Sequence, residues 1–248
     1  MDPIFLGITA LAVLFAGISK GGFGSGAAFA SSAILALILP PGAALGIMLP
    51  LLMLMDVTGL RAYWGKWHWP DARVLLIGSV PGTVLGALFF TMVNADVIRI
   101  LIGVISLAFV GWQMAQRVGL VNLSQQRFGP RTGLITGVAL GFTSFVSHAG
   151  GPAAAVYLLG QRLAKTQYQA TTVLVFWAVN LFKSIFYAGM GIFTWETITT
   201  TVMFAPVAFL GTWLGIRAHY MVPERLFYTL TYTMLTVTGA KLMYDGVM

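Results

Sequence analysis

The chain has 248 residues, of which 58% are hydrophobic and only 8% are charged. Because soluble domains carry roughly 25% charged residues, this composition predicts a polytopic membrane protein. The net charge of +7 does not indicate nucleic acid, since the basic residues lie in short loops between apolar runs, as topology signals do. Cysteine is absent, which excludes disulfides, thiol catalysis and thiolate metal sites.

The first apolar part of the chain is interrupted at residues 16–27, which hold five glycines, two serines and one lysine. The apolar runs on either side, residues 4–16 and 27–39, would each reach only about 20 Å as helices. A bilayer core needs about 20 residues, and dense glycine disfavours one continuous helix. We therefore expect two half-helices that meet at an unwound loop inside the membrane. Such backbone is tolerated only where it is buried in protein or lines a watery cavity, so this loop is a candidate substrate site.

Further along the chain, apolar runs long enough to cross a bilayer alternate with short polar loops. The expected spanning helices are residues 43–60, 74–93, 97–114, 167–188, 197–216 and 226–243. The loop at residues 61–73 is basic and rich in tryptophan, which is typical of a membrane interface. A second interrupted element has a polar break at residues 143–152 between the apolar runs 132–142 and 153–163. The chain is therefore predicted to form one all-α transmembrane domain, residues 1–248.

The two halves of the chain share a pattern of polar and helix-breaking residues. Matching positions lie 124 to 128 residues apart. The pairs are Lys20 with His148, Asp56 with Asn180, Trp69 with Trp195, Pro81 with Pro206, Gly86 with Gly211, and Arg99 with Arg225. We interpret this nearly constant offset as an internal repeat, with one copy at residues 1–117, a connecting loop at 118–130 and a second copy at 131–248. Chance similarity between apolar helices is the alternative.

The distribution of basic residues predicts how the chain crosses the membrane. If both interrupted elements enter and leave on the same side, ten lysines and arginines lie at one face and two at the other. If each element crosses once, the bases split seven to five and specify no orientation. The positive-inside rule therefore favours re-entrant hairpins, three full spans per repeat, and both termini in the periplasm of a bacterial inner membrane. Three crossings invert the second repeat relative to the first, and inverted repeats with broken helices are a transporter architecture.

Four ionisable residues lie within apolar segments, where a charge is costly and marks a pathway or a pair. They are Lys20, Asp56, His148 and Lys183. Lys20 and His148 occupy the tips of the two hairpins, and the second half-helix of each hairpin begins just after its tip. The positive helix N-termini therefore face the membrane centre. Two helix N-termini with a lysine and a histidine predict an anion site.

The candidate substrate-binding residues are those of the two tips. They are Ser19, Lys20, Gly21, Gly22, Phe23, Gly24 and Ser25 in the first hairpin, and Ser144, Ser147, His148, Gly150 and Gly151 in the second. Serines add hydroxyl donors, and glycines let the backbone approach a ligand closely. Asp56, Asn180 and Lys183 are candidates for ion coupling or pairing. Alternatively, Lys20 forms a purely structural ion pair with Asp56, and His148 is a satisfied core histidine.

Motifs of enzymes are not recognisable in the sequence. It has no histidine and carboxylate cluster at metal-ligand spacing and no glycine loop between a strand and a helix. We therefore expect no enzymatic activity, no metal and no cofactor.

Several segments resemble those of a known family. They are Gly-Ile-Ser-Lys-Gly-Gly-Phe-Gly at residues 17–24, Ser-His-Ala-Gly-Gly-Pro at 147–152, and Pro-x4-Gly at 81–86 and 206–211. Over essentially its whole length the chain resembles the TauE/SafE family of sulfite exporter-like membrane proteins, also called the four-toluene-sulfonate uptake permease family. The resemblance implies transport of sulfite or of organosulfur anions such as sulfoacetate, and it leaves the substrate open.

Together these features predict a secondary transporter of a small anion, with sulfite or an organosulfonate favoured. The expected partners are the anion and membrane lipid. Coupling to protons through His148 or Asp56, coupling to sodium, and a homodimer all stay open. The alternatives are a passive anion channel, a transporter of another small anion, and a membrane-embedded enzyme or assembly subunit.

Overall fold

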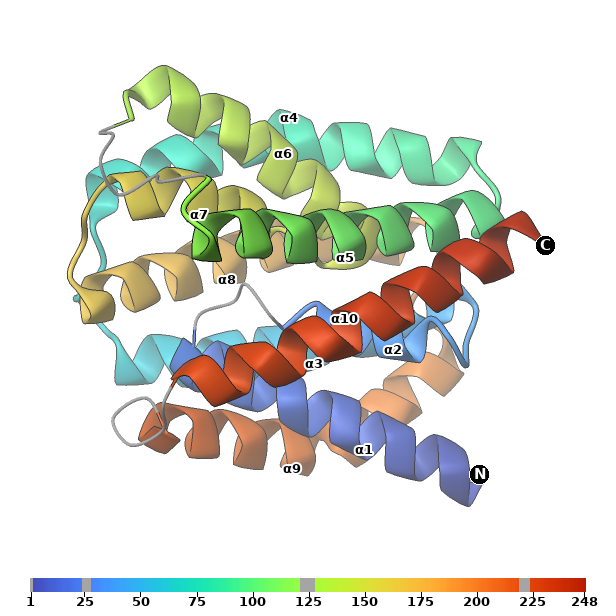
Figure 1. Ribbon diagram of the computed structural model, residues 1–248. Helices are drawn as coiled ribbons and strands as arrows, with labels where there is room; N and C mark the ends of the chain where they lie inside the picture. Colours follow the sequence, from blue (N-terminus) through green and yellow to red (C-terminus); the bar gives the residue numbers. More distant parts are fainter. Residues whose placement is uncertain (1, 24–27, 121–127, 219–223) are drawn as a thin grey trace.

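The fold is a bundle of helices, described by a computed structural model (Figure 1). The structure describes residues 2–23, 28–120, 128–218 and 224–248, and within these ranges all regular structure is helical, as the composition predicts. The elements in chain order are α1 (Pro3–Ile18), the π-helical segment η1 (Ser19–Phe23), α2 (Ala30–Leu35), α3 (Pro41–Ala62), α4 (Trp69–Met92), α5 (Ala95–Arg117), α6 (Pro130–Ser147), α7 (Gly151–Gly160), α8 (Lys165–Gly189), α9 (Trp195–Ala218) and α10 (Glu224–Val247).

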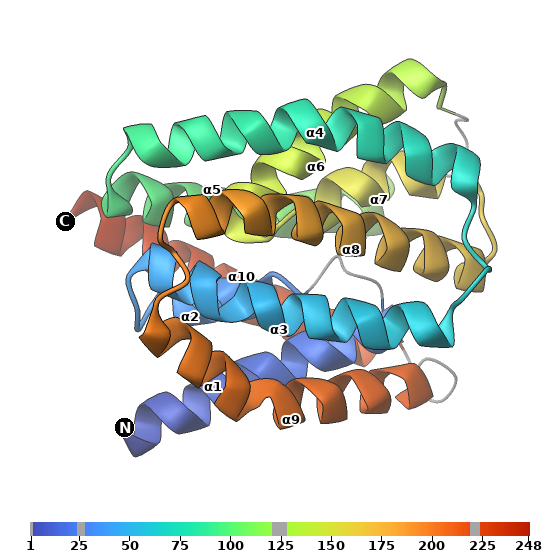
Figure 2. The ribbon, with the colours of Figure 1, turned by 180° about the vertical axis from the view of Figure 1, so that it is seen from behind.

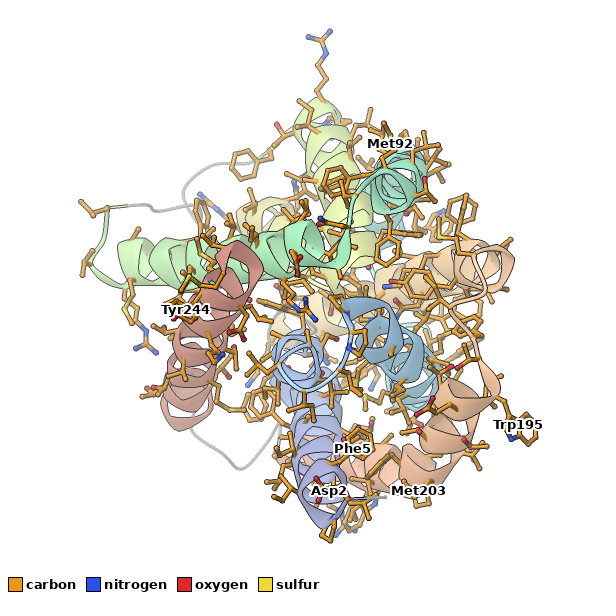
Figure 3. All side chains as sticks on the ribbon, turned by 90° about the vertical axis from the view of Figure 1, so that its right-hand side faces the viewer. Asp2, Phe5, Met92, Trp195, Met203 and Tyr244 are labelled. Atoms are coloured by element: carbon orange, nitrogen blue, oxygen red, sulfur yellow. The ribbon has the colours of Figure 1, made fainter. Side chains whose placement is uncertain are left out.

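The long helices run roughly side by side, so the molecule has two ends (Figure 1). Both termini lie at one end, the terminal end, which Figure 3 shows face-on. The connections from α3 to α4 and from α7 to α8 lie at the other end, the loop end (Figures 1 and 2). Trp195 is 81% exposed at the terminal end and Trp64 is 71% exposed at the loop end. Because tryptophan favours membrane interfaces, we expect the two ends to face the two water layers.

Among the described residues, six helices are long and apolar enough to cross a membrane. Five of them are α3, α4, α5, α8 and α9, which match five of the predicted spans; only Val93, at the end of the span 74–93, lies outside its helix. The sixth is the continuous run Pro3–Phe23, which the sequence had suggested was too short to span. The last predicted span, residues 226–243, lies in α10, whose 24 residues have the necessary length but are not among the six, so its crossing stays a prediction.

The first hairpin has a shorter break than the glycine content predicts. Helix continues through α1 and η1 to Phe23, and the next helix begins at Ala30. The physical reason is that Gly21 and Gly22 pack their backbones against α9, where a Cβ would overlap the carbonyl oxygens of Thr212 and Gly215. Close packing of this kind offsets the cost of glycine in a helix. The returning helix α2 has only six residues and is shorter than the predicted run at residues 27–39.

The second hairpin is broken only at residues 148–150, rather than over the predicted residues 143–152. The helix α6 extends to Ser147, because the hydroxyls of Thr143 and Ser147 donate to carbonyls one turn earlier, at 2.7 and 2.8 Å, and are satisfied within the helix. His148 ends the helix in the left-handed conformation, with φ 58°. The helix α7 then begins at Gly151 with Pro152 in its first turn, as the sequence predicts.

The two hairpins approach the centre from opposite ends. The chain enters the bundle at the terminal end through α1 and returns to that end through α2, whereas α6 and α7 enter and return at the loop end (Figures 1 and 2). Each hairpin packs mainly on one long helix. The first hairpin contacts α9 through α1 and η1, and the second contacts α4 through α6.

Glycines make both of these interfaces close. A Cβ at Gly17 would lie 2.8 Å from the backbone of Gly211, and a Cβ at Gly137 would lie 2.8 Å from the Leu75 carbonyl oxygen. These distances leave no room for a side chain, so the paired helices touch backbone to backbone. Gly86 and Gly211 also make close contacts, because a Cβ at Gly86 would lie 2.7 Å from Cβ of Phe145 and one at Gly211 would lie 2.7 Å from the Leu14 carbonyl oxygen.

We predict that Gly137→Ala separates α6 from α4 and destabilises the protein. The added methyl meets backbone atoms of Leu75 and Gly78 on α4, which cannot rotate away, and overpacking of this kind costs about 1–3 kcal/mol. Thermal unfolding of the detergent-solubilised protein, followed by the loss of its monodisperse chromatographic peak, measures the effect.

The matched control is Gly111→Ala on α5, where an added Cβ meets nothing within 4 Å. That variant is expected to unfold at the wild-type temperature or slightly above, because alanine favours helix over glycine by about 1 kcal/mol. Equal unfolding temperatures for the two variants would contradict the close-packing account.

Candidate functional site

The tip of the first hairpin holds a buried ion pair. Lys20, on η1, places its Nζ 2.6 Å from Oδ1 of Asp56, on α3. Both residues are buried, and Asn180 on α8 donates from Nδ2 to the other carboxylate oxygen at 2.7 Å. The ammonium also lies 5.6 Å from the centre of the Phe176 ring. This arrangement matches the pairing alternative for Lys20 and gives the negative charge of Asp56 two partners.

A second buried group lies at the tip of the other hairpin. Lys183, on α8, is buried and donates from Nζ to the Ser144 carbonyl oxygen at 2.8 Å and to the Ser144 hydroxyl at 3.1 Å. Its Nζ also lies 2.6 Å from Nδ1 of His148. The three ammonium hydrogens therefore have three neutral acceptors.

The contacts of His148 assign its protonation state. Its Nε2 lies 3.1 Å from the carbonyl oxygen of Leu45 on α3. A carbonyl oxygen only accepts hydrogen bonds and an ammonium only donates them, so Nε2 carries the proton and Nδ1 accepts. We therefore assign a neutral imidazole, which links α3 to Lys183 on α8.

The two groups lie near each other and form one polar cluster, defined here as Lys20, Asp56, His148, Asn180 and Lys183. Asn180, which bonds Asp56, and Lys183, which bonds His148, lie about one turn apart on α8. The N-terminus of α7 begins three residues after His148, so its positive dipole end adds to the same region. The structure thus brings together all four ionisable residues that the sequence singles out within apolar segments.

The other predicted tip residues divide into three groups. Ser19, Ser147, Gly150 and Gly151 are buried, and the hydroxyl of Ser147 donates to its own helix at 2.8 Å rather than into the cluster. Gly21, Gly22 and Phe23 lie in η1, with the two glycines against α9. Gly24 and Ser25 lie outside the described residues.

Two side chains that the sequence did not suggest hold the first tip in place. Tyr63 donates from its hydroxyl to the carbonyl oxygen of Gly21 at 2.9 Å, and Gln169 donates from Nε2 to the carbonyl oxygen of Lys20 at 2.7 Å. Lys20 and Gly21 are among the last four residues of the helical run, where carbonyls lack donors within the helix, and these bonds supply them. The sequence could have indicated Gln169, because it is a polar residue inside an apolar span. Tyr63 lies in a loop rich in aromatic residues, where nothing distinguishes it from its neighbours.

With both lysines protonated, the cluster carries a net positive charge. Two lysines face one aspartate, and the histidine is neutral. Among the described residues, no carboxylate forms an ion pair with Lys183, and no group of three or more histidines and carboxylates has the arrangement to hold a metal ion. A buried positive charge of this kind has the chemistry to hold a small anion.

Comparison with known proteins identifies a family. The family model "Sulfite exporter TauE/SafE" matches residues 9–242, which is nearly the whole chain. No curated protein and no solved structure matches. TauE/SafE proteins are membrane transporters of the sulfite and sulfonate anion class rather than enzymes. The length of the match confirms the resemblance seen in the sequence motifs, and the chain belongs to the TauE/SafE sulfite exporter family.

Proposed function

We propose that this protein is a secondary transporter that moves sulfite or an organosulfonate across the bacterial inner membrane by alternating access. The observation that carries the proposal is the buried amino group of Lys183, which has only neutral partners among the described residues and is an uncompensated charge when protonated. Burying an uncompensated charge costs several kcal/mol. An anion bound beside Lys183 removes that cost, so the cluster favours an anionic ligand.

An anion that binds in the cluster would replace hydrogen bonds that the side chains make to one another in this structure. An incoming oxyanion competes with Ser144 and His148 for the ammonium of Lys183, and with Asp56 for that of Lys20. A proton delivered to His148 converts Nδ1 from an acceptor into a donor and adds a second positive charge beside Lys183. Co-binding of a proton with the anion is therefore the coupling that this geometry favours, and Asp56 is the other candidate proton carrier.

The packing of the helices supports two inverted repeats. If the repeats are 1–117 and 131–248, α1 corresponds to α6, α3 to α8 and α4 to α9. The contact of α1 with α9 then corresponds to the contact of α6 with α4. Asp56 and Asn180 are matching residues and bond directly to each other, as residues beside a two-fold axis do. We infer an axis between α3 and α8, next to the cluster, about which the two halves exchange roles during transport.

The two ends of the molecule differ in charge, which supports an orientation. The loop end carries the basic residues at the ends of α3, α5, α7 and α9 and at the starts of α4, α6 and α8. The terminal end carries Arg99 and Lys241, each paired with an aspartate, and also Asp2 and Glu196. By the positive-inside rule the loop end faces the cytoplasm and both termini face the periplasm.

We predict that Lys183→Met weakens anion binding while the protein still folds. Methionine is similar in length, and the change removes a buried charge instead of stranding one. Hydrogen bonds to charged groups contribute about 1.5–3 kcal/mol, so affinity for sulfite or sulfoacetate should fall about 10- to 150-fold. Equilibrium binding to the purified protein measures it. Lys241→Met, which removes an exposed lysine paired with Asp245 at the terminal end, should keep wild-type affinity, and wild-type affinity in Lys183→Met would refute the site.

A paired substitution separates binding by Lys20 from a purely structural role. Lys20→Met alone leaves the buried carboxylate of Asp56 without its cation, which should cost about 3–5 kcal/mol of stability. The double variant Lys20→Met/Asp56→Asn removes both charges and should recover most of that stability, measured by thermal unfolding. We expect the double variant to be folded but inactive in anion flux. Wild-type flux would assign the pair to structure alone.

Flux measurements in proteoliposomes distinguish a transporter from the alternative of a passive channel. A transporter that alternates access saturates with substrate, and an unlabelled anion on the far side accelerates entry of labelled sulfite. We expect both behaviours here, because the described cluster is closed by its own hydrogen bonds and has to rearrange for each anion. Flux that rises linearly with concentration and shows no counterflow would instead support the channel.

A further inference from the structure

A cavity of about 480 Å³ lies beside the first hairpin tip, separate from the buried cluster. It lies among α5, α7, the start of α8, η1 and α10. Its lining includes Gly22, Phe109, Arg117, Arg162, Lys165 and Tyr232. None of the five cluster residues lines it.

The polarity of this cavity changes from its rim to its interior. Arg117, Arg162 and Lys165 are exposed and lie where α5 ends, α7 ends and α8 begins, at the loop end. Gln169 and Gly22 are buried, and Gln169 is the residue that bonds to the Lys20 carbonyl oxygen. The cavity therefore extends from a basic rim at the loop end to Gln169, which bonds to Lys20 of the cluster.

The charge of the lining has one sign. Three basic side chains occur among the described residues that line the cavity, and neither aspartate nor glutamate does. The guanidinium of Arg117 lies 5.0 Å from the centre of the Tyr232 ring, which positions it over an aromatic wall. Arg162 holds the left-handed conformation, with φ 56°, which directs the chain between α7 and α8 around the rim. A rim of this kind attracts anions and raises their local concentration.

The remaining wall is apolar and aromatic, which limits the ligand further. Phe109, Leu158 and Tyr232 are buried in the wall, and Leu159 is 40% exposed. A volume of 480 Å³ falls within the range of small-molecule sites, about 300–1,000 Å³. An inorganic oxyanion would occupy a small part of it and would leave the apolar wall uncovered.

We propose that this cavity is an outer binding site for an organic anion, with its acidic head on Arg117, Arg162 and Lys165 and its apolar body against Phe109 and Tyr232. The anion docks here from the loop end before its head reaches the buried cluster. This inference rests on the proposed transport function and adds a second site to it. Because the basic residues are exposed, binding weakens as salt is raised.

The test is equilibrium binding of benzenesulfonate and of sulfite to the purified full-length protein. The starting protein is Lys183→Met, which lacks the inner anion site. We expect benzenesulfonate to bind this variant, and Arg162→Asn/Lys165→Gln added to it to weaken that binding about tenfold or more. Asparagine is chosen at 162 because it tolerates the left-handed conformation. Lys66→Gln/Arg73→Gln, two exposed bases at the same end but outside the lining, should leave the affinity unchanged.

A second pair of variants changes only the charge of the wall. Leu159→Glu places a carboxylate in the cavity and should abolish benzenesulfonate binding, whereas Leu159→Gln, of the same size, should largely keep it. Failure of benzenesulfonate to bind the wild type, its loss in Lys183→Met alone, or equal binding by the two Leu159 variants would each overturn the outer site. Sulfite binding that depends on Lys183 would still support the transport proposal in all three cases.

Discussion

The buried ammonium of Lys183 is the constraint on which the rest of the account depends. It is enclosed between α6 and α8, and its three hydrogens meet two oxygens of Ser144 and the Nδ1 of a neutral His148. Nothing negative lies in direct contact with it among the described residues, while the nearby Lys20 is already neutralised by Asp56. An uncompensated charge inside a membrane is rare and marks a functional site. Here the function would be anion binding, in which Lys183 contacts the anion when it is bound and Ser144 and His148 when it is not.

Close backbone packing gives the cluster a rigid frame. The first hairpin rests on α9 and the second on α4, so each hairpin is held by a helix from the opposite half of the chain. Glycines at these interfaces, such as Gly17 and Gly137, bring the paired helices into direct backbone contact. The polar contacts of Asp56, Asn180 and His148 instead join α3 to the hairpin tips and to α8. Movement of the α1–α9 pair relative to the α4–α6 pair therefore has to break hydrogen bonds in the cluster rather than the glycine interfaces.

The sequence predicts the helical class, five of the spans and the identity of the buried charges, because hydropathy and the cost of charge in lipid are local properties. It does not reveal that the helix continues to Phe23, because a glycine that breaks a helix and a glycine that packs against a distant one look alike in sequence. For the same reason, the sequence does not show which side chains the buried charged residues contact. The pair of Lys20 with Asp56 was one alternative, whereas the contact of Lys183 with His148 depends on where α8 lies beside the end of α6.

The most direct test of the central claim is to locate a bound anion. Selenite has the shape and charge of sulfite, and selenium scatters anomalously at an accessible X-ray edge. Anomalous diffraction from crystals of the protein grown with selenite should place a selenium peak beside Nζ of Lys183, with an oxygen of the anion within hydrogen-bonding distance. Selenite bound elsewhere, with Lys183 still held by Ser144 and His148, would contradict the account.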